Sequence, residues 1–199
     1  MGIEWRRFEN NARCAGYKMI AGIDEAGRGP LAGPVVAAAV IFPEVTYIPG
    51  INDSKKLTPA KRENLYEQIY ENAISIGLGI IDSAEIDKIN ILQASLLSMR
   101  IAVANLFPRP DYLLIDGTFT IRSQIPQKAI KKGDSQSLSI AAASIIAKVS
   151  RDRIMKRYSE DFPGYGFHKH KGYGTRMHLE AIRTLGPTLI HRKTFRGVK

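Results

Sequence analysis

The chain has 199 residues, of which 44% are hydrophobic and 24% charged, so it can bury a core of useful size and is not disordered throughout. Its formal net charge of +10 favours a polyanionic partner, with nucleic acid preferred over an anionic membrane surface. Cys14 is the only cysteine, which excludes an internal disulfide and any zinc site that needs two cysteine ligands.

The first part of the chain is expected to hold three strands and one helix. Residues Met19 to Glu25 predict a short apolar strand that ends in two carboxylates, and Val35 to Phe42 predicts a second strand after a Gly/Pro-rich loop. The Thr58-Pro59 pair is typical of a helix N-terminus, and this helix is predicted to end near Asn72. A third strand is predicted from Ala73 to Ile81.

In the second part of the chain, helices are expected to alternate with strands. The predicted elements are a helix over Ile91 to Leu106, strands over Asp111 to Asp116 and Gln127 to Lys132, a long helix over Ser135 to Met155, a loop over Pro163 to Gly174, and a last helix over Arg176 to Leu185. This order predicts one α/β domain over residues 1–199, with a mixed central sheet flanked by helices and a basic, helical C-terminal part.

No segment predicts secretion or membrane insertion. The N-terminal residues 1–6 lack the apolar core of a signal peptide, and the longest apolar stretch, Leu31 to Phe42, is too short to span a bilayer. We therefore expect a soluble, cytoplasmic protein without a membrane partner. Nothing in the sequence demands more than a monomer.

Four acidic side chains lie at the ends of predicted elements. Asp24 and Glu25 end the first strand, Asp116 ends the buried strand, and Asp134 comes just before the long helix. Ligands collect at strand ends in open α/β sheets, so these carboxylates can converge on one point. Their mutual repulsion would be relieved by Mg²⁺ or Mn²⁺, because both ions prefer carboxylate oxygens. The pattern predicts a two-metal site for displacement at a phosphodiester.

Structural interpretations of these carboxylates are also open. Asp134 suits the N-cap of the long helix, and Asp116 before a glycine suits a turn. Asp24 and Glu25 are harder to explain structurally, since an apolar strand gains nothing by ending in two adjacent charges. Neighbouring strand residues face opposite ways, so both can bind metal only if the chain turns at Glu25, which the following Ala-Gly pair permits.

The loop after the first strand contains Gly27-Arg28-Gly29-Pro30, whose glycines let the backbone approach another molecule closely. Its N–H and C=O groups could contact a sugar hydroxyl. Residues 27–32 also fit the dinucleotide pattern G-x-G-x-x-A, but a proline and a β-branched run follow instead of a helix, and two carboxylates precede it. We therefore reject a dinucleotide site here.

The last nineteen residues carry half of the net positive charge. No acidic residue follows Glu180, whereas five basic residues do: Arg183, Arg192, Lys193, Arg196 and Lys199. Such a basic tail either contacts nucleic acid or only adds solubility.

Aromatic, basic and glycine residues alternate between Gly164 and Gly174. Aromatic rings stack on bases or sugars while cations contact phosphates, so this stretch favours nucleic-acid binding; the alternative is a turn that packs its rings inward. Lys55, Ser144 and Lys148 are further candidates for substrate contact, although each also suits an ordinary surface position.

Six motifs follow one another along the chain. They are I-D-E-A-G-R-G-P-L-A-G-P-V-V-A-A-A-V over residues 23–40, D-S-K-K-L over 53–57, L-L-I-D-G over 113–117, K-G-D over 132–134, S-I-A-A-A-S-I-I-A-K-V over 139–149 and H-K-G-Y-G-T over 170–175. The series covers most of the chain and resembles the bacterial ribonuclease HII family. The resemblance implies a ribonuclease H-like fold and an endonuclease, dependent on Mg²⁺ or Mn²⁺, that cleaves RNA within RNA–DNA hybrids.

The resemblance also implies roles for individual residues. The metal-binding catalytic residues would be Asp24, Glu25, Asp116 and Asp134. The backbone of Gly27-Arg28-Gly29 would contact the 2′-hydroxyl, and Tyr173 would assist there and pack on the following sugar. Members of the family cut on the 5′ side of a ribonucleotide embedded in duplex DNA and leave 3′-hydroxyl and 5′-phosphate ends. Two alternatives stay open, namely a non-enzymatic nucleic-acid-binding protein and another nuclease of the same superfold, such as a junction resolvase.

Overall fold

Five strands form a mixed sheet in the computed structural model, which describes residues 4–198, so the expectations for residues 1–3 and for Lys199 lie outside the described residues. The strands are β1 (Ile20–Ala26), β2 (Val35–Ile41), β3 (Ser75–Ile81), β4 (Tyr112–Asp116) and β5 (Gln127–Ile130). They lie in the order β3-β2-β1-β4-β5, antiparallel from β3 to β1 and parallel from β1 to β5. The mixed sheet expected from the sequence is therefore confirmed.

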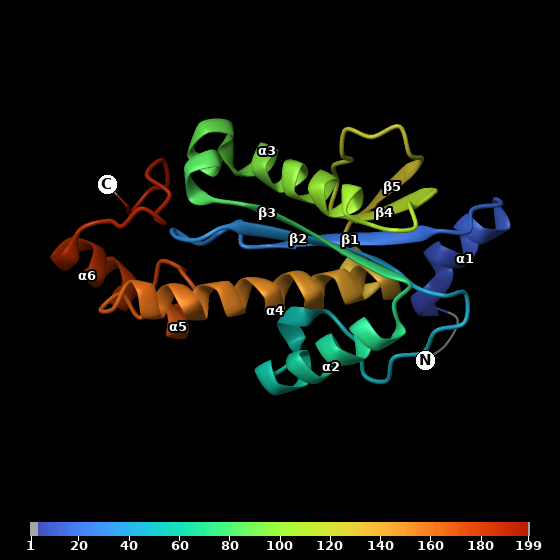
Figure 1. The fold of residues 1–199 in the computed structure, drawn as a ribbon, viewed down its shortest axis with the longest axis horizontal. Coiled ribbons are helices and arrows are strands. Elements are labelled where there is room, and N and C mark those ends of the chain that lie inside the picture. Colours follow the sequence, from blue (N-terminus) through green and yellow to red (C-terminus); the bar gives the residue numbers. More distant parts are fainter. Residues whose placement is uncertain (1–3, 199) are drawn as a thin grey trace.

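Helices cover both faces of the sheet (Figure 1). The three long ones are α2 (Pro59–Asn72), α3 (Ser83–Ala104) and α4 (Leu138–Asp161). α3 packs on one face, whereas α4 packs on the other with α2 beside it. The side chains of β2 alternate between the two faces of the sheet, and all seven are buried because helices cover both faces. Ala38 and Val40 join the core with α2 and α4, whereas Ala39 and Ile41 join the core with α3.

Two glycines allow helices to approach the sheet very closely. A Cβ on Gly22 of β1 would lie 2.2 Å from the carbonyl carbon of Ser139 in α4. A Cβ on Gly79 of β3 would lie 1.9 Å from the carbonyl oxygen of Ser98 in α3. Any larger residue would collide with backbone atoms at these positions, so the two glycines set the spacing between sheet and helices.

Capping side chains determine where two of the helices begin. Thr58 accepts a hydrogen bond from an N–H of the first turn of α2, and the start predicted from the Thr58-Pro59 pair is confirmed. α4 begins at Leu138 rather than at Ser135, because Ser137 is its N-cap. It also continues beyond the predicted end to Asp161.

α3 begins at Ser83, well before the start predicted at Ile91. Asn90 interrupts it with a left-handed φ of 66°, and its Oδ1 accepts hydrogen bonds from the N–H groups of Leu92 and Gln93. Asn90 therefore acts as an internal cap. The sequence pattern predicted the segment after this cap and missed the one before it.

Shorter helices lie at the two ends of the molecule (Figure 1). They are η1 (Glu4–Arg6), α1 (Arg7–Cys14), α5 (Phe167–His170) and α6 (Arg176–Leu185). α1 was not predicted, and α5 interrupts a predicted loop, whereas the bounds of α6 are confirmed. The buried Glu9 of α1 accepts hydrogen bonds from Ser137 and Ser139, which joins α1 to the start of α4. Within residues 4–198, no helix has the length and apolar character needed to cross a membrane.

Candidate active site

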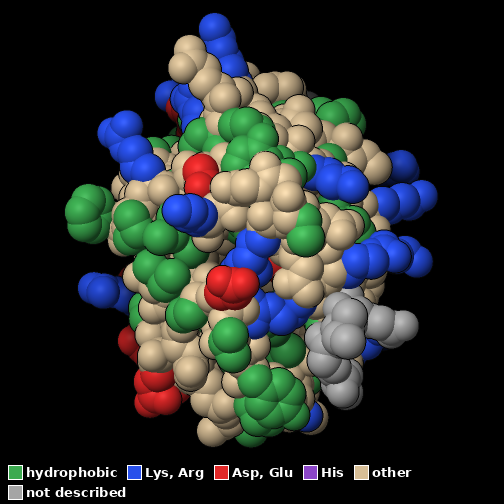
Figure 2. Space-filling view, turned by 90° about the vertical axis from the view of Figure 1, so that its right-hand side faces the viewer, with side chains coloured by type: hydrophobic (Ala, Val, Ile, Leu, Met, Phe, Trp, Pro, Cys, Tyr) green, Lys and Arg blue, Asp and Glu red, His purple; other side chains and the backbone are tan. Residues whose placement is uncertain are grey.

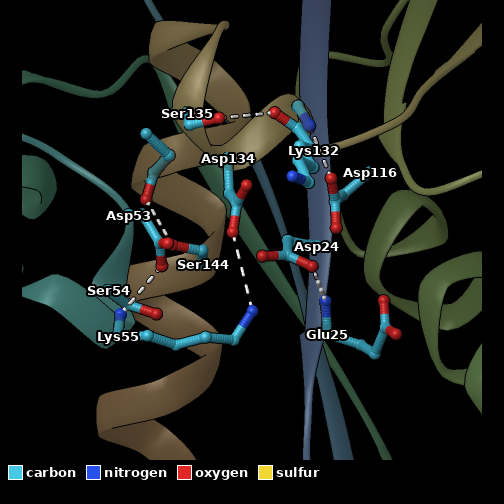
Figure 3. Close-up of polar contacts among 12 residues, drawn as sticks. Asp24, Glu25, Asp53, Ser54, Lys55, Asp116, Lys132, Asp134, Ser135 and Ser144 are labelled. Atoms are coloured by element: carbon cyan, nitrogen blue, oxygen red, sulfur yellow. Dashed lines mark hydrogen bonds and ion pairs between the residues drawn. The ribbon is translucent and has the colours of Figure 1, made fainter.

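Three of the four predicted carboxylates lie together near the carboxyl ends of two neighbouring strands in the interior of the sheet. Asp24 belongs to β1 and Asp116 ends β4, and these strands run parallel with Ile23 opposite Ile115. Asp134 lies in the short helix η3 (Gly133–Ser135), which leads into α4. One oxygen from each carboxylate lies within 4.8 Å of the others, and the three side chains point toward one another (Figure 3).

Glu25 does not join this group. β1 continues through Ala26, which pairs with Val36, so the chain does not make the turn at Glu25 that a metal site shared by Asp24 and Glu25 would require; it turns at Gly27, where φ is +103°. The Glu25 carboxylate therefore points away from the other three (Figure 3), and its Oε1 lies 3.3 Å from the Arg28 guanidinium. Burial raises the pKa of Glu25, and the nearby Arg28 opposes that rise.

The structural alternatives for Asp134 and Asp116 have different outcomes. Asp134 is not the N-cap of α4, because that position belongs to Ser137. Asp116 does have a structural contact, since its Oδ1 accepts a hydrogen bond of 2.7 Å from the N–H of Gly133. This bond ties the end of β4 to the turn that carries Asp134, so it helps to assemble the carboxylate cluster.

The electrostatics of the cluster favour bound cations. Burial raises the pKa of Asp24 well above its ordinary value, and the charges of Glu25 and Asp116 raise it further. Burial and the charge of Asp116 likewise raise the pKa of Asp134. Lys55 approaches Asp134 to 3.6 Å, but its side chain is 80% exposed and screened by water. A buried set of carboxylate oxygens with this excess of negative charge fits Mg²⁺ or Mn²⁺.

A cleft beside the cluster contains every residue predicted to contact substrate. It is lined by Asp24, Glu25, Ala26, Gly27, Arg28, Gly29, Ser54, Lys55, Ser144, Lys148, Arg151 and Tyr173. Ser144 is buried rather than an ordinary surface residue, and its hydroxyl donates to the carbonyl of Ala141. Lys148 is half-buried and pairs with Asp152 at 2.6 Å. Burial lowers the pKa of Lys148.

The aromatic and basic stretch divides into an inner and an outer part. Tyr165 and Phe167 are buried and stacked, with ring centroids 5.3 Å apart, as expected of a turn that packs its rings inward. Tyr173 instead remains 47% exposed and lines the cleft. Its ring stands opposite Gly29, where a Cβ would lie 3.6 Å from the nearest ring carbon. The inward-packing interpretation is therefore confirmed for Tyr165 and Phe167, and a nucleic-acid contact stays a prediction for Tyr173.

Two buried arginines beside the cleft were not recognised from the sequence. Arg151 is 1% exposed, and Arg192 is fully buried, so Arg192 is not part of a solvated basic tail. Arg183, Lys193 and Arg196 are exposed, as such a tail requires. The sequence carries no signal for either buried arginine, because charged residues are expected at the surface.

Two of the buried histidines form a hydrogen-bonded chain that leads to Tyr173. Nδ1 of His191 accepts from the N–H of Thr188 at 2.9 Å, so its Nε2 carries the proton and donates to Nε2 of His178 at 3.1 Å. Nδ1 of His178 then donates to the carbonyl of Tyr173 at 2.9 Å. Both rings are therefore neutral with fixed tautomers. Burial lowers the pKa of His191 to about 4.

This histidine chain predicts a loss of stability in acid. His191 has a lower pKa in the folded protein than in the unfolded chain, so the unfolded chain binds more protons between pH 6.5 and about 4. The contribution of His191 is complete above pH 6.5 and is lost toward pH 4, by at most about 1.4 kcal/mol per pH unit. Urea unfolding of the protein and of His191→Gln between pH 7 and pH 5 measures this contribution as the difference between the two proteins. The raised pKa values of Asp24 and Asp134 act in the opposite direction but cancel in that difference. A difference that does not change with pH would contradict the prediction.

Comparisons with known proteins show which family this chain belongs to. A family model described as Ribonuclease HII matches residues 21–198. The chain belongs to the ribonuclease HII family. A ribonuclease HII from Geotalea uraniireducens is 64% identical over 96% of this chain and 89% of its own length. One from Geobacter metallireducens is 61% identical over 96% of this chain and 90% of its own length.

The solved structures agree with the family assignment. The ribonuclease H2 from Pyrococcus horikoshii matches with a TM-score of 0.75 and 26% identity, over 90% of this chain and 94% of that one. The ribonuclease H-like fold is therefore confirmed, and so is a metal-dependent ribonuclease H that acts on RNA–DNA hybrids. The alternative of a non-enzymatic nucleic-acid-binding protein is wrong for a ribonuclease HII.

Proposed function

We propose that this ribonuclease HII also cuts duplex DNA on the 5′ side of a single embedded ribonucleotide, leaving 3′-hydroxyl and 5′-phosphate ends. One observation supports the proposal: Asp24, the Gly27-Arg28-Gly29 loop and Tyr173 line the same cleft. A phosphodiester beside Asp24 would therefore have its ribose within reach of the loop and the next sugar near the aromatic ring. Such positioning of the reacting bond supplies a large part of nuclease catalysis.

We further propose that Asp24, Glu25, Asp116 and Asp134 hold two Mg²⁺ or Mn²⁺ ions. When bound, the ions would supply charge neutralisation and Lewis-acid activation of water at the phosphodiester. Asp24, Asp116 and Asp134 already converge. Glu25 comes from the family resemblance and would have to leave its contact with Arg28 to join them.

Other residues of the chain would bind and orient the duplex. The ammonium groups of Lys55 and Lys148 suit contacts with phosphate, and the buried Ser144 forms part of the wall of the same cleft. Figure 2 shows the end of the molecule that carries α1, where Lys and Arg side chains are spread over the surface and suit a phosphate backbone. We propose that residues 1–199 act as one catalytic domain, as a monomer in the cytoplasm.

The test uses three duplexes and a chelator. We expect cleavage of an RNA–DNA hybrid and of a DNA duplex with one ribonucleotide, no cleavage of all-DNA duplex, and no product when EDTA is present. Mapping of the ends should place each cut on the 5′ side of the ribonucleotide. Cleavage of a four-way DNA junction, or a cut on the 3′ side, would contradict the proposal and favour another nuclease of the same superfold.

Packing of Tyr173 on the following sugar would favour an RNA-to-DNA junction, and Tyr173→Ala is expected to weaken that preference. Stacking of an aromatic ring on a base contributes about 1–3 kcal/mol, and a contact of similar strength with the sugar would make kcat/KM at the junction fall about fivefold to 150-fold. Cleavage within a continuous RNA strand should change less, because a 2′-hydroxyl on the next sugar would crowd the ring in the unmodified protein. Tyr173→Phe keeps the ring and is the matched control. Unchanged selectivity in Tyr173→Ala would argue against this contact.

A further inference from the structure

Two buried guanidinium groups donate hydrogen bonds to backbone carbonyls of the loop between β1 and β2, residues 27–34, which we call the glycine loop. Arg192 donates to the carbonyl oxygens of Gly27 at 2.5 Å, Arg28 at 2.9 Å and Gly33 at 2.9 and 3.0 Å. Arg151 of α4 donates to Pro34 at 2.9 Å, to Lys171 at 3.0 Å and to Ala32 at 3.1 Å. Within residues 4–198 neither guanidinium forms an ion pair, so their charge is spread over backbone carbonyls.

The loop fits closely around these side chains. A Cβ on Gly27 would lie 2.2 Å from Nε of Arg151, and one on Gly33 would lie 3.4 Å from its Nη2. The segment that carries Arg192 is fastened in turn by Asp87 of α3, whose carboxylate accepts from the N–H groups of Lys193 and Thr194 at 2.8 and 3.0 Å. The arginines and the loop therefore form one closely packed unit.

A carbonyl group that is held by a hydrogen bond fixes the direction of the N–H group of the following residue. In a trans peptide, the C=O of one residue and the N–H of the next point in opposite directions. Because Arg192 takes the carbonyls of Gly27 and Arg28, the N–H groups of Arg28 and Gly29 point away from Arg192. Neither N–H has a hydrogen-bond partner among the described residues, and both residues line the cleft. A guanidinium on the carbonyl side also polarises each peptide and strengthens its N–H as a donor.

We propose that Arg192, supported by Arg151, is a positioning residue that aims two backbone N–H donors into the cleft and thereby sets the preference for ribose over deoxyribose. This inference rests on the proposed function, because it assigns those donors to the 2′-hydroxyl. A hydroxyl oxygen accepts such a hydrogen bond, whereas the C2′ of a deoxyribose offers no acceptor.

The test compares affinities for two duplexes that differ in one oxygen atom. Fluorescence anisotropy in EDTA, where nothing is cleaved, gives Kd for a DNA duplex with one ribonucleotide and for the same duplex without it. We expect the unmodified protein to prefer the ribonucleotide about fivefold, the amount that one net hydrogen bond supplies. Arg192→Lys keeps the charge but cannot reach three carbonyls at once. Its preference should fall to within about twofold of unity, while its affinity for all-DNA duplex stays unchanged.

Two further variants separate positioning from folding. Arg196→Lys changes an exposed arginine of the same segment and should keep the full preference. If Arg192→Lys does not fold, Asp87→Ala loosens the same segment without removing a buried charge and should lower the preference in the same direction. A fall in both affinities together would indicate a merely structural role and overturn the inference.

The outcomes also distinguish this inference from the proposed function. An unmodified protein without any ribose preference in binding would overturn both the loop contact and the positioning role. A ribose preference that survives in Arg192→Lys and in Asp87→Ala would overturn the positioning role alone and leave the proposed function intact.

Discussion

Asp134→Asn is expected to lower the rate of RNA–DNA hybrid cleavage about a thousandfold or more while leaving hybrid affinity nearly unchanged. Asparagine keeps the shape of the side chain but removes its negative charge and one of its two carboxylate oxygens. The remaining pair, Asp24 and Asp116, would no longer provide three converging ligands. Affinity should persist because contacts with the phosphate backbone supply most of the binding energy.

Single-turnover cleavage in Mg²⁺ measures the rate, and anisotropy with the same hybrid in EDTA measures the affinity. Asp161→Asn is the matched control, since Asp161 is an exposed aspartate at the far end of α4. It should cleave like the unmodified protein. Full activity of Asp134→Asn in Mg²⁺ would refute the assignment of Asp134 to the metal site.

Gly22→Ala is expected to destabilise the protein by about 3 kcal/mol and to reduce its activity as well. The new methyl group would lie 2.2 Å from the carbonyl carbon of Ser139 and 2.4 Å from the nitrogen of Ile140, so β1 and α4 would have to separate. Asp24 follows two residues later on β1, and Asp134 lies just before α4. The same displacement would therefore move two of the proposed metal ligands apart.

Urea unfolding measures the loss of stability. Gly174→Ala is the control, because a Cβ there would lie 3.1 Å from a terminal methyl group of Leu31, which can yield. This control should cost less than about 1 kcal/mol. Equal stabilities of Gly22→Ala and Gly174→Ala would show that the contact between β1 and α4 can relax.

The sheet and the position of the acidic residues could be predicted because they depend on local patterns. Val35–Ile41 is an apolar run of seven residues, and its short length, its β-branched residues and the preceding Gly-Pro pair favour a buried strand over a helix. Asp116 is the last residue of β4 and Asp24 lies two residues before the end of β1, so their approximate places required only the two strands to be recognised. Their convergence with Asp134 depended on parallel pairing of β1 and β4, which the expected mixed sheet allowed.

The features that could not be predicted depend on tertiary contacts. α1 has only eight residues, and one of its two buried residues, Glu9, is charged, so a local apolar pattern gives little indication of it. Glu25 faces away from the cluster because β1 stays paired through Ala26, a register that no local pattern specifies. Arg192 is buried only because backbone carbonyls distant in sequence surround its guanidinium, and a sequence pattern cannot show these partners.

The contact of Arg192 with the Gly27 loop joins residues 165 positions apart. During synthesis on the ribosome, the loop and all four acidic residues leave the exit tunnel well before Arg192 does. A nascent chain can thus bring Asp24, Asp116 and Asp134 out of the tunnel while Arg192 does not yet hold the loop. Selectivity for ribose would then be the last property this nuclease acquires, and a polypeptide cut short before Arg192 would lack it.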